Sequence, residues 1–418
     1  MIDACEERIL KKTGPNPNPI PWTRREFIAA PAAFLAASQL LRPSDLLSAE
    51  AASAAGAKKI ITRTLGKTGI AVPIISMGDP GSNAPGLIRR SYEIGIRHFD
   101  TASTYQEGKS ETQLGQTIKE MGVRKDVIIA TKIAIMEPGQ PLDSAQAAKN
   151  LKETFEVSLK RLQTDYVDIL YLFHVDDEAA LAMEGPLQVL SDLKKQGRIR
   201  ATAVSFHRTE PMLNEVLRLG GFDVVLVPFN WPMASDQGLL STINRAHQEG
   251  IGIVAMKAMA GGVKKRGEQS PGFAGAMRTA LQKWVLRNEA FATLLSSFGT
   301  FEHIEENFSV AYDLTYTDEE KKVLADKNAM AELEFCRHCG KCSATCPSDA
   351  AIPTLMRAHM HALRYYPGTG HPHEALATIP AGRGLDACSR CEKCTASCAW
   401  TVNIPRNIAQ LQAWRRSA

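Results

Sequence analysis

Two runs of cysteine near the carboxyl end have the most specific spacing in the chain. Eight of its nine cysteines lie between positions 336 and 398, in two repeats of the pattern C-x2-C-x2-C-x3-C. The first run is Cys336, Cys339, Cys342 and Cys346, and the second is Cys388, Cys391, Cys394 and Cys398. With this spacing three thiolates from one tight turn reach three irons of a cubane, and the fourth points toward a second cluster. The pattern therefore predicts two [4Fe–4S] clusters.

The same geometry predicts that the two runs exchange their fourth cysteines. One cluster is expected to take Cys336, Cys339, Cys342 and Cys398, and the other Cys388, Cys391, Cys394 and Cys346. Zinc also binds C-x2-C pairs, but it would leave the third and fourth positions of each run unexplained. A disulfide framework is typical of small secreted domains, whereas this chain has no cysteine between Cys5 and Cys336. Five histidines of this region are expected to be solvated or to cap helices, because no cysteine ligand is missing: His338, His359, His361, His371 and His373.

Four residues earlier in the chain could together transfer a proton. They are Asp100, Tyr105, Lys132 and His174. A tyrosine hydroxyl has a pKa near ~10, which makes it a poor acid at neutral pH. An adjacent ammonium stabilises the phenolate and lowers that pKa, and a carboxylate keeps the ammonium charged and in place. We therefore assign Tyr105 as general acid/base, tuned by Lys132, with Asp100 as the partner of Lys132. His174 is assigned to orient a substrate carbonyl.

The segments around these residues predict a closed barrel. From about residue 60 to residue 313, short apolar runs alternate with amphipathic stretches such as Ser144–Leu162. Eight strands are expected: Val72–Met77, Arg97–Asp100, Val127–Thr131, Tyr166–Phe173, Ile199–Ser205, Asp223–Val227, Ile251–Met256 and Ala292–Ser297. Eight strands alternating with helices over ~250 residues fit a parallel (β/α)8 TIM barrel. Chemistry in such barrels lies at the carboxyl ends of the strands, which is where all four proton-transfer residues fall. Taken singly, each could be an ordinary ion pair or a core histidine.

At these positions the sequence resembles the aldo-keto reductase family. The segments that carry the resemblance are Phe99 to Tyr105, Ala130-Thr131-Lys132, Leu172-Phe173-His174, Leu65 to Gly69 and Gly197 to Arg200. It covers about residues 60–325 and implies an oxidoreductase. A histidine at position 174 implies interconversion of a carbonyl and an alcohol rather than reduction of a carbon–carbon double bond.

The resemblance also implies a nicotinamide dinucleotide, NAD(P)(H), bound at the same strand ends. Family contacts are retained at Ser205, Glu306 and Asn307, and the backbone of Gly299 and Thr300 precedes a helix that could meet a phosphate. Other family contacts are replaced, namely by Phe206, Leu226, Met256, Ser297 and His303. The last two stand where the family holds a 2′-phosphate with basic residues, so a preference for NADP is not implied. The alternatives are another electron carrier or loss of the cofactor.

The first 57 residues resemble a twin-arginine signal peptide with a linker. Arg24 and Arg25 precede an uncharged stretch from Phe27 to Leu41, which is shorter than the ~20 residues of a membrane span. Cleavage sites of A-x-A type occur at Ala49 to Ala51 and Ser53 to Ala55. The expectation is export to the bacterial periplasm by the twin-arginine translocase, with no stable membrane span in the mature protein. A disordered extension with a chance Arg-Arg pair is the alternative.

The expected organisation is therefore a leader (1–57), a barrel (58–325) and a mainly α-helical ferredoxin-like iron–sulfur domain (326–418). The net charge of +4 is mild and no Lys/Arg run predicts a nucleic-acid partner. We expect an exported oxidoreductase that acts on a small carbonyl or alcohol, of sugar or aldehyde/ketone class. Its clusters would relay electrons to a redox partner protein. The alternative is a reductase-derived binding or redox-sensing module with structural clusters and no turnover.

Overall fold

The computed structural model describes residues 59–79, 84–135, 143–260, 275–331, 333–365, 371–400 and 402–417. The expected leader and the loop 261–274 lie outside the described residues. Residues Lys59–Ala418 form one compact unit, which contains both the barrel and the cysteine-rich region.

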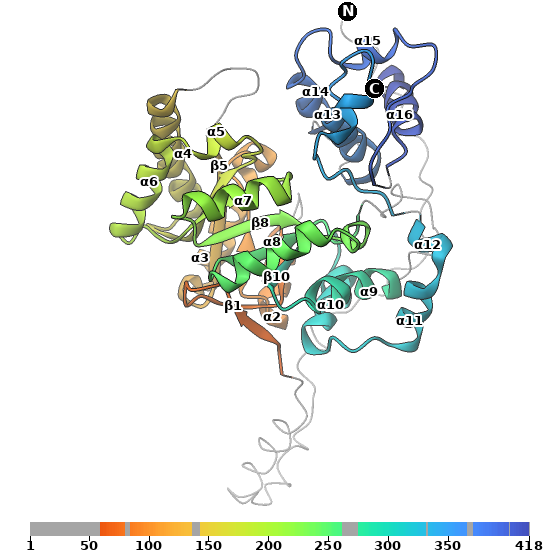
Figure 1. Cartoon of the computed structure of the whole chain (residues 1–418). Helices are drawn as coiled ribbons and strands as arrows, with labels where there is room; N and C mark the ends of the chain where they lie inside the picture. Colours follow the sequence, from red (N-terminus) through yellow and green to blue (C-terminus); the bar gives the residue numbers. More distant parts are fainter. Residues whose placement is uncertain are drawn as a thin grey trace, which may run out of the picture. The chain divides into compact units, whose positions relative to one another are not determined.

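Eight parallel strands close into a barrel, which confirms the predicted fold (Figure 1). In barrel order they follow the sequence, and β10 closes against β3. The strands are β3 (Ile75–Met77), β4 (His98–Asp100), β5 (Ile128–Ala134), β6 (Val167–Phe173), β7 (Ile199–Ser205), β8 (Val224–Pro228), β9 (Gly252–Met256) and β10 (Phe291–Ser296). We call the end of the barrel where these strands finish the barrel mouth.

The first predicted strand, Val72–Met77, is divided in the structure. Its first half is β2 (Ala71–Pro73), which pairs antiparallel with β1 (Thr62–Thr64). Only β3 joins the barrel. Pro73 has no backbone N–H and cannot continue a central strand, so the chain leaves one sheet and enters the other at this point.

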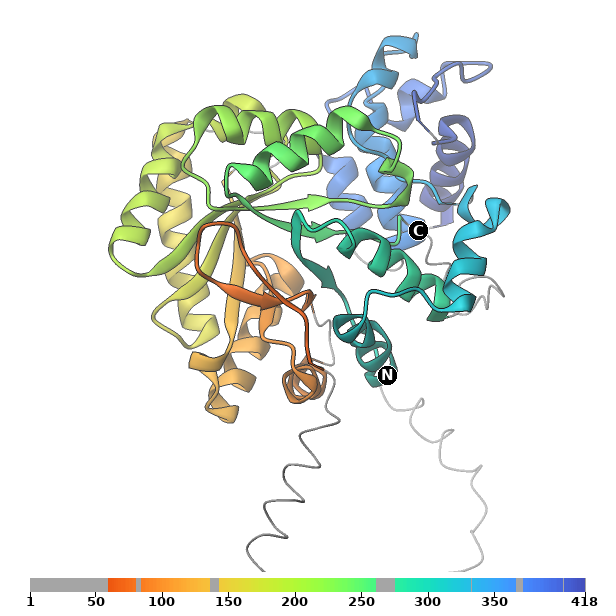
Figure 2. The same ribbon diagram turned by 60° about the horizontal axis from the view of Figure 1, so that its bottom comes forward.

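The hairpin β1–β2 lies across the end of the barrel opposite the mouth (Figure 2). Leu65, Ile70 and Val72 are fully buried and pack with barrel-interior residues such as Ile128 and Val254. At roughly 1.5–3 kcal/mol for each buried aliphatic side chain, this apolar plug contributes substantially to closing the barrel base. The chemistry is thereby confined to the mouth.

Helices cover the outside of the barrel, as the amphipathic stretches predict. They are α2 (Ala84–Ile94), α3 (Lys109–Met121), α4 (Ser144–Leu162), α5 (Glu178–Leu181), α6 (Glu184–Lys195), α7 (Thr209–Leu219), α8 (Gln237–Gln248), α9 (Gly275–Leu286) and α10 (Phe301–Ser309). In α4 the buried residues include Ala147, Leu151 and Phe155, at the four-residue spacing of one helix face. Asp143 caps the helix by accepting a hydrogen bond from the N–H of Gln146.

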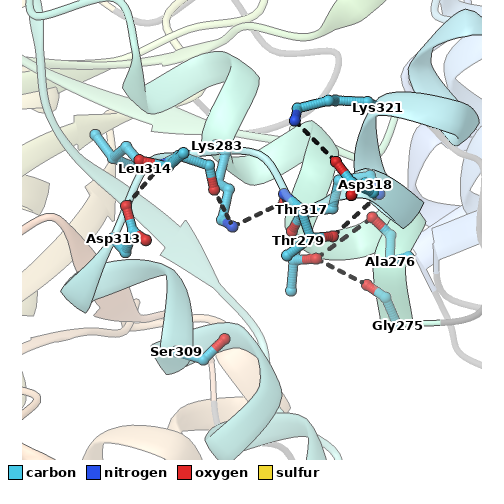
Figure 3. Close-up of polar contacts among 12 residues, drawn as sticks. Gly275, Ala276, Thr279, Lys283, Ser309, Asp313, Leu314, Thr317, Asp318 and Lys321 are labelled. Atoms are coloured by element: carbon cyan, nitrogen blue, oxygen red, sulfur yellow. Dashed lines mark hydrogen bonds and ion pairs between the residues drawn. The ribbon is translucent and has the colours of Figure 1, made fainter.

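Two helices lead from the barrel to the cysteine-rich region: α11 (Asp318–Ala325) and α12 (Lys327–Ala331). Figure 3 shows how α11 is attached to α9. The Lys283 ammonium donates to the carbonyl of Thr315 and to Glu320 Oε2, each at 2.8 Å. Glu320 also completes a capping box with Thr317 at the start of α11. The lysine and glutamate are buried, so the pair fixes the direction in which the chain leaves the barrel.

The C-terminal domain has its own small apolar core. Its helices are α13 (Ile352–Met360), α14 (His371–Ala377), α15 (Leu385–Cys388) and α16 (Ile404–Ser417). Leu355, Met356, Ile408 and Leu411 are buried between α13 and α16, and several cysteines pack against them. Residues His361–Tyr365 continue α13 as a π-helical turn. Among the described residues no helix is both long enough and apolar enough to cross a membrane.

Candidate functional site

Three strand ends bring the four predicted proton-transfer residues to the barrel mouth. Asp100 ends β4, Lys132 lies in the neighbouring β5, and His174 follows β6. The Lys132 ammonium donates to Asp100 Oδ1 and to the carbonyl of Thr101, the latter at 2.8 Å. Both side chains of the pair are almost completely buried. The parallel register explains the meeting, because Asp100 pairs with Ala130, two residues before the lysine.

Tyr105 lies over this ion pair but does not have the pKa expected from the ammonium alone. The Lys132 nitrogen is 5.0 Å from the centre of the Tyr105 ring. Burial, followed by the charges of Asp100 and Asp79, raises the pKa of the Tyr105 hydroxyl above its ordinary value. The ammonium is already engaged by a carboxylate and a carbonyl, so little of its charge acts on the phenol. The phenol is therefore protonated at neutral pH and is placed to donate.

The carboxyl of Asp100 has a pKa close to neutral pH. Burial raises its pKa to about 6, although Lys132 opposes the shift. Its second oxygen, Oδ2, is buried without a hydrogen-bond partner. Asp100 is thus a titratable support for Lys132 rather than a permanently charged one.

His174 is exposed at the mouth in an uncommon backbone conformation. Its φ of 57° lies in the left-handed region, which a residue other than glycine rarely adopts. The ring stacks on Phe173 with centroids 3.8 Å apart and lies 5.0 Å from the ring of His207. Desolvation of its ring, followed by the charges of His207 and Arg357, holds the pKa of His174 well below its usual range. A neutral imidazole can donate a hydrogen bond to a carbonyl oxygen.

The predicted nucleotide contacts fall into two groups in the structure. Ser205 ends β7, and its buried hydroxyl has no hydrogen-bond partner within the protein. The hydroxyl can therefore form a hydrogen bond with a ligand. Gly299 and Thr300 are exposed before α10, where the Thr300 hydroxyl accepts from the N–H of His303. These three residues fit the nicotinamide and phosphate ends of a dinucleotide.

The two residues predicted for the adenine end are occupied by contacts within the protein. Glu306 pairs with Arg278 of α9 at 2.5 Å. Asn307 Oδ1 accepts from Gln282 of the same helix at 2.6 Å and is buried. The sequence could not predict these contacts, because α9 and α10 meet only in the folded barrel. As it stands, Asn307 does not fit a role in adenine binding, and Glu306 offers only Oε1, which is buried without a hydrogen-bond partner.

The eight cysteines gather in two sets, and each set draws on both runs. The inner cysteine set is Cys336, Cys339, Cys342 and Cys398, which line one small cavity. The outer cysteine set is Cys346, Cys388, Cys391 and Cys394; the other three thiols of this set act on the pKa of Cys388, which burial raises to about 11. These groupings are the ones that the spacing predicts. No disulfide joins the eight thiols.

The surroundings of the sulfur atoms fit iron–sulfur clusters. The backbone N–H of Ala350 donates to Cys346 Sγ and that of Trp400 donates to Cys398 Sγ, each at 3.4 Å. Hydrogen bonds to the sulfurs, together with an apolar wall, are the means by which proteins tune such clusters. Burial raises the pKa of Cys336 to about 12, so metal loading must displace its proton.

The C-terminal domain contacts the barrel at its mouth. Arg337 forms an ion pair with Asp236 and donates to the carbonyl of Pro232 at 2.5 Å. Arg357 of α13 lies 3.8 Å from Asp176, two residues after His174. The inner cysteine set therefore lies on the barrel side of the domain.

Several residues of the mouth were missed by sequence reasoning. His338 was expected to be solvated, but both of its ring nitrogens are buried, and its charge acts on Asp176. His359 is also buried and bonds Gln410 at 2.8 Å, so the expectation is wrong for these two, whereas His361 is buried but stands at the C-cap of α13. The side chains of His207, Asp176 and Arg357 carry no local signal, because they meet through contacts between distant segments.

Comparisons with known proteins agree with a chain made of a barrel and a C-terminal cysteine-rich domain. Residues 82–280 match the model of the aldo/keto reductase family, and residues 335–403 match that of a 4Fe-4S dicluster domain. The chain therefore joins an aldo/keto reductase domain to a C-terminal iron–sulfur domain. It is an oxidoreductase of aldo/keto reductase type.

Two curated relatives match this chain over nearly their whole length. The chain is 25% identical over 308 residues to an L-galactose dehydrogenase of Arabidopsis thaliana, which covers 66% of this chain and 95% of the relative. It is 25% identical over 331 residues to an L-glyceraldehyde 3-phosphate reductase of Escherichia coli O157:H7, with coverages of 65% and 94%. A solved aldo-keto reductase of Pseudomonas aeruginosa superposes with a TM-score of 0.50 at 25% identity, over 61% of this chain and 95% of the other.

Proposed function

We propose that the protein interconverts a carbonyl and an alcohol on a small substrate of sugar or aldehyde/ketone class. The observation that carries the proposal is the meeting of Tyr105, Lys132, Asp100 and His174 at one barrel mouth. The relatives named as an L-galactose dehydrogenase and an L-glyceraldehyde 3-phosphate reductase support both the substrate class and the type of reaction.

The roles of the chain's own groups follow from their geometry. In the reductive direction the neutral His174 donates a hydrogen bond to the carbonyl oxygen, and Tyr105 delivers the proton that becomes the alcohol O–H. The Lys132 ammonium lies 5.0 Å from the centre of the Tyr105 ring, and Asp100 holds it there beside the phenolate that this leaves. In the oxidative direction the same proton returns to Tyr105. Its raised pKa keeps the Tyr105 hydroxyl protonated at neutral pH, so the proton is present for the reductive direction.

We infer a nicotinamide dinucleotide as the hydride carrier, held through Ser205, Gly299 and Thr300. The group would supply or accept the hydride at the substrate carbon. Glu306 and Asn307 would have to exchange Arg278 and Gln282 for the adenine end, so tight binding by these two is not part of the proposal. Denaturing the purified protein and analysing the supernatant for released nucleotide or flavin tests the carrier directly.

We further propose that the inner and outer cysteine sets each hold one [4Fe–4S] cluster and together relay electrons. Each cluster passes one electron at a time, whereas the carbonyl–alcohol step moves two. The contact of the inner set's domain with the barrel mouth supports an order in which electrons pass between the mouth, the inner set, the outer set and a redox partner protein.

Export to the periplasm by the twin-arginine translocase is part of the proposal and rests on Arg24 and Arg25. Clusters are inserted in the cytoplasm, and this route carries folded proteins, so the two features agree. Replacing both arginines by lysine should retain the full-length protein in the cytoplasm. Unchanged periplasmic recovery would remove this part of the proposal.

A second candidate is a binding or redox-sensing module without turnover. The engaged state of Glu306 and Asn307 favours it. Tyr105→Phe separates the candidates, because loss of the proton donor should lower turnover ~10²–10⁴-fold while leaving ligand binding unchanged. A protein that binds a carbonyl compound but converts none, with or without Tyr105, would support the sensing module.

A further inference from the structure

The turn that carries Tyr105 has an uncommon backbone conformation. Tyr105 begins the short segment η2 (Tyr105–Gly108). The next two residues, Gln106 and Glu107, have φ of 50° and 59°, and Gly108 has φ of 86°. Residues other than glycine rarely adopt this left-handed region, and they persist in it where the surrounding structure enforces it. The turn therefore needs partners that hold it.

An arginine of α4 lies against this turn. Arg161 belongs to the last turn of α4, and its Nη1 donates to the carbonyl of Ser103 at 3.0 Å, two residues before the tyrosine. A Cβ added at Gly108 would lie 2.2 Å from Arg161 Cζ, so the guanidinium lies directly against the backbone there. One side chain thus contacts the chain on both sides of Tyr105.

A buried glutamate holds that arginine in place. Glu111 lies in the first turn of α3, and its side chain is 0% exposed. Its Oε2 accepts from Arg161 Nη1 at 3.2 Å, and its Oε1 accepts from the hydroxyl of Thr131 at 2.7 Å. A buried carboxylate is stable only when it is paired and hydrogen-bonded, and here both oxygens are used. Thr131 directly precedes Lys132 on β5.

The same set of bonds joins the turn to Lys132. The N–H and the hydroxyl of Ser103 both donate to the carbonyl of Lys132, at 3.0 Å and 3.1 Å. Ser103 is therefore bonded to Lys132 on one side and to Arg161 on the other. The Lys132 ammonium lies 5.0 Å from the centre of the Tyr105 ring. Because Glu111 and Arg161 contact neighbours of both residues, they are placed to set this separation.

We propose that Glu111 and Arg161 are positioning residues, which hold the hydroxyl of Tyr105 in the pose from which it transfers a proton. They act through Ser103 and Gly108 rather than by contact with the substrate. The inference rests on the proposed role of Tyr105 in carbonyl–alcohol interconversion and adds the residues that fix its pose. Loss of the pair should release the turn, so proton transfer should slow while the mouth still binds substrate.

The first test observes the pose of Tyr105 without turnover. Fluorotyrosine is incorporated at position 105 of the cluster-loaded full chain, and its fluorine resonance is recorded in wild type, Arg161→Met and Glu111→Gln. We expect one narrow resonance in wild type and a shifted or doubled resonance in both variants. Arg161→Lys keeps the charge but not the fork, so it should restore the resonance in part.

A matched control lies on the same helix as the arginine. Lys149 of α4 is 64% exposed, and its ammonium is 3.9 Å from Glu153. Lys149→Met therefore removes a cation and an ion pair of α4 without touching the turn. Its fluorine resonance and its turnover should equal those of wild type.

Turnover supplies the second readout. For a carbonyl compound that the wild type reduces, kcat should fall roughly tenfold or more in Arg161→Met and Glu111→Gln, with KM nearly unchanged. Circular dichroism and iron content verify that each variant is folded and loaded. If either variant fails to fold, Thr131→Val carries the test, because it removes one hydrogen bond to Glu111 and leaves the ion pair. Its resonance should move in the same direction and its kcat should fall a few-fold.

The outcomes separate this inference from the proposed function. Unchanged resonance in folded Arg161→Met and Glu111→Gln would overturn the inference and leave the pair as an ordinary contact between α3 and α4. A raised KM with unchanged kcat would overturn it as well. By contrast, a resonance that moves in both variants, in a protein that converts no carbonyl or alcohol, would reject turnover and support the positioning of Tyr105.

Discussion

The inner and outer cysteine sets have the same sequence pattern but different surroundings. Cys336 of the inner set packs against the hydrophobic core of the barrel. The neighbouring Arg337 guanidinium lies 3.6 Å from the centre of the Trp400 ring. By contrast, Cys388 and Cys391 of the outer set line an open cavity together with residues of the last helix, α16.

The difference shows that spacing determines which metal group can bind, whereas packing determines what that group can exchange electrons with. Solvent exposure and nearby charges set the potential of an iron–sulfur cluster. A set that packs against the barrel is suited to exchange electrons with the barrel mouth, and a set that lines an open cavity is suited to exchange them with another molecule. The two sets should therefore respond differently to equivalent changes.

The largest expected effect comes from removing one thiolate from each set. Cys336→Ser and Cys391→Ser should each lower bound iron from about eight to about four atoms per chain. Only the inner variant should also lower the temperature at which the barrel unfolds, because Cys336 alone of the two packs against the barrel core. Iron analysis, spin quantification after dithionite reduction and calorimetry measure the three quantities. Equal thermal shifts in both variants would contradict the distinction between inner and outer sets.

A second prediction concerns the contact that holds the inner set against the barrel. Arg337→Gln leaves the largely buried carboxylate of Asp236 without its ion-pair partner, and breaking such a pair costs about 3–5 kcal/mol. Chemical denaturation should show this loss of unfolding free energy. The matched control is Arg383→Gln, whose pair with Asp349 in the same domain is exposed and worth about 0–1 kcal/mol. A loss below about 1 kcal/mol at Arg337 would mean that the domain is held by other contacts.

How far the sequence predicts this molecule depends on the distance over which each feature is determined. The cysteine sets follow from spacing within two short runs, and the meeting of Asp100 with Lys132 follows from parallel strands ending together. The division of Val72–Met77 at Pro73 was missed because the apolar pattern continues through the proline. The binding of Glu306 by Arg278 could not be predicted, since it depends on how two helices pack.

The mouth residues supplied by the C-terminal domain show the same limit more sharply. Arg357 and Asp176 are far apart in sequence, and neither belongs to a motif. The rise in the Tyr105 pKa was also missed, because it depends first on burial of the hydroxyl in the folded barrel and then on the charges of Asp100 and Asp79. Sequence identifies which groups are present, whereas their net electrostatic balance is a property of the fold.

Turnover at the barrel mouth should depend on pH, whereas oxidation of the clusters should not show the same dependence. The pKa of Asp100 is about 6 in the folded protein, so lowering the pH below this value protonates Asp100 and removes the charge that holds Lys132. Turnover should therefore fall roughly tenfold per pH unit on this acid limb, and Asp100→Asn should be slow at all pH values and lack the limb. Stopped-flow oxidation of the dithionite-reduced clusters should not follow the same limb. If the cluster oxidation rate had the same pH midpoint as turnover, cluster oxidation would depend on Asp100 as well.

The smallest expected effect tests whether the outer set faces a redox partner. Arg415 and Arg416 line the cavity beside Cys388 and Cys391, and exposed charges of this kind change association rates more than affinities. Reduced protein should transfer electrons to the anionic acceptor hexacyanoferrate at a rate that falls as salt is added. In Arg415→Gln/Arg416→Gln the rate should fall a few-fold further, with no change for a neutral quinone acceptor. If electron transfer to both acceptors slows equally, the arginines act on the cluster itself. If electron transfer to neither acceptor slows, electrons leave the protein elsewhere and not through the open side of the outer set.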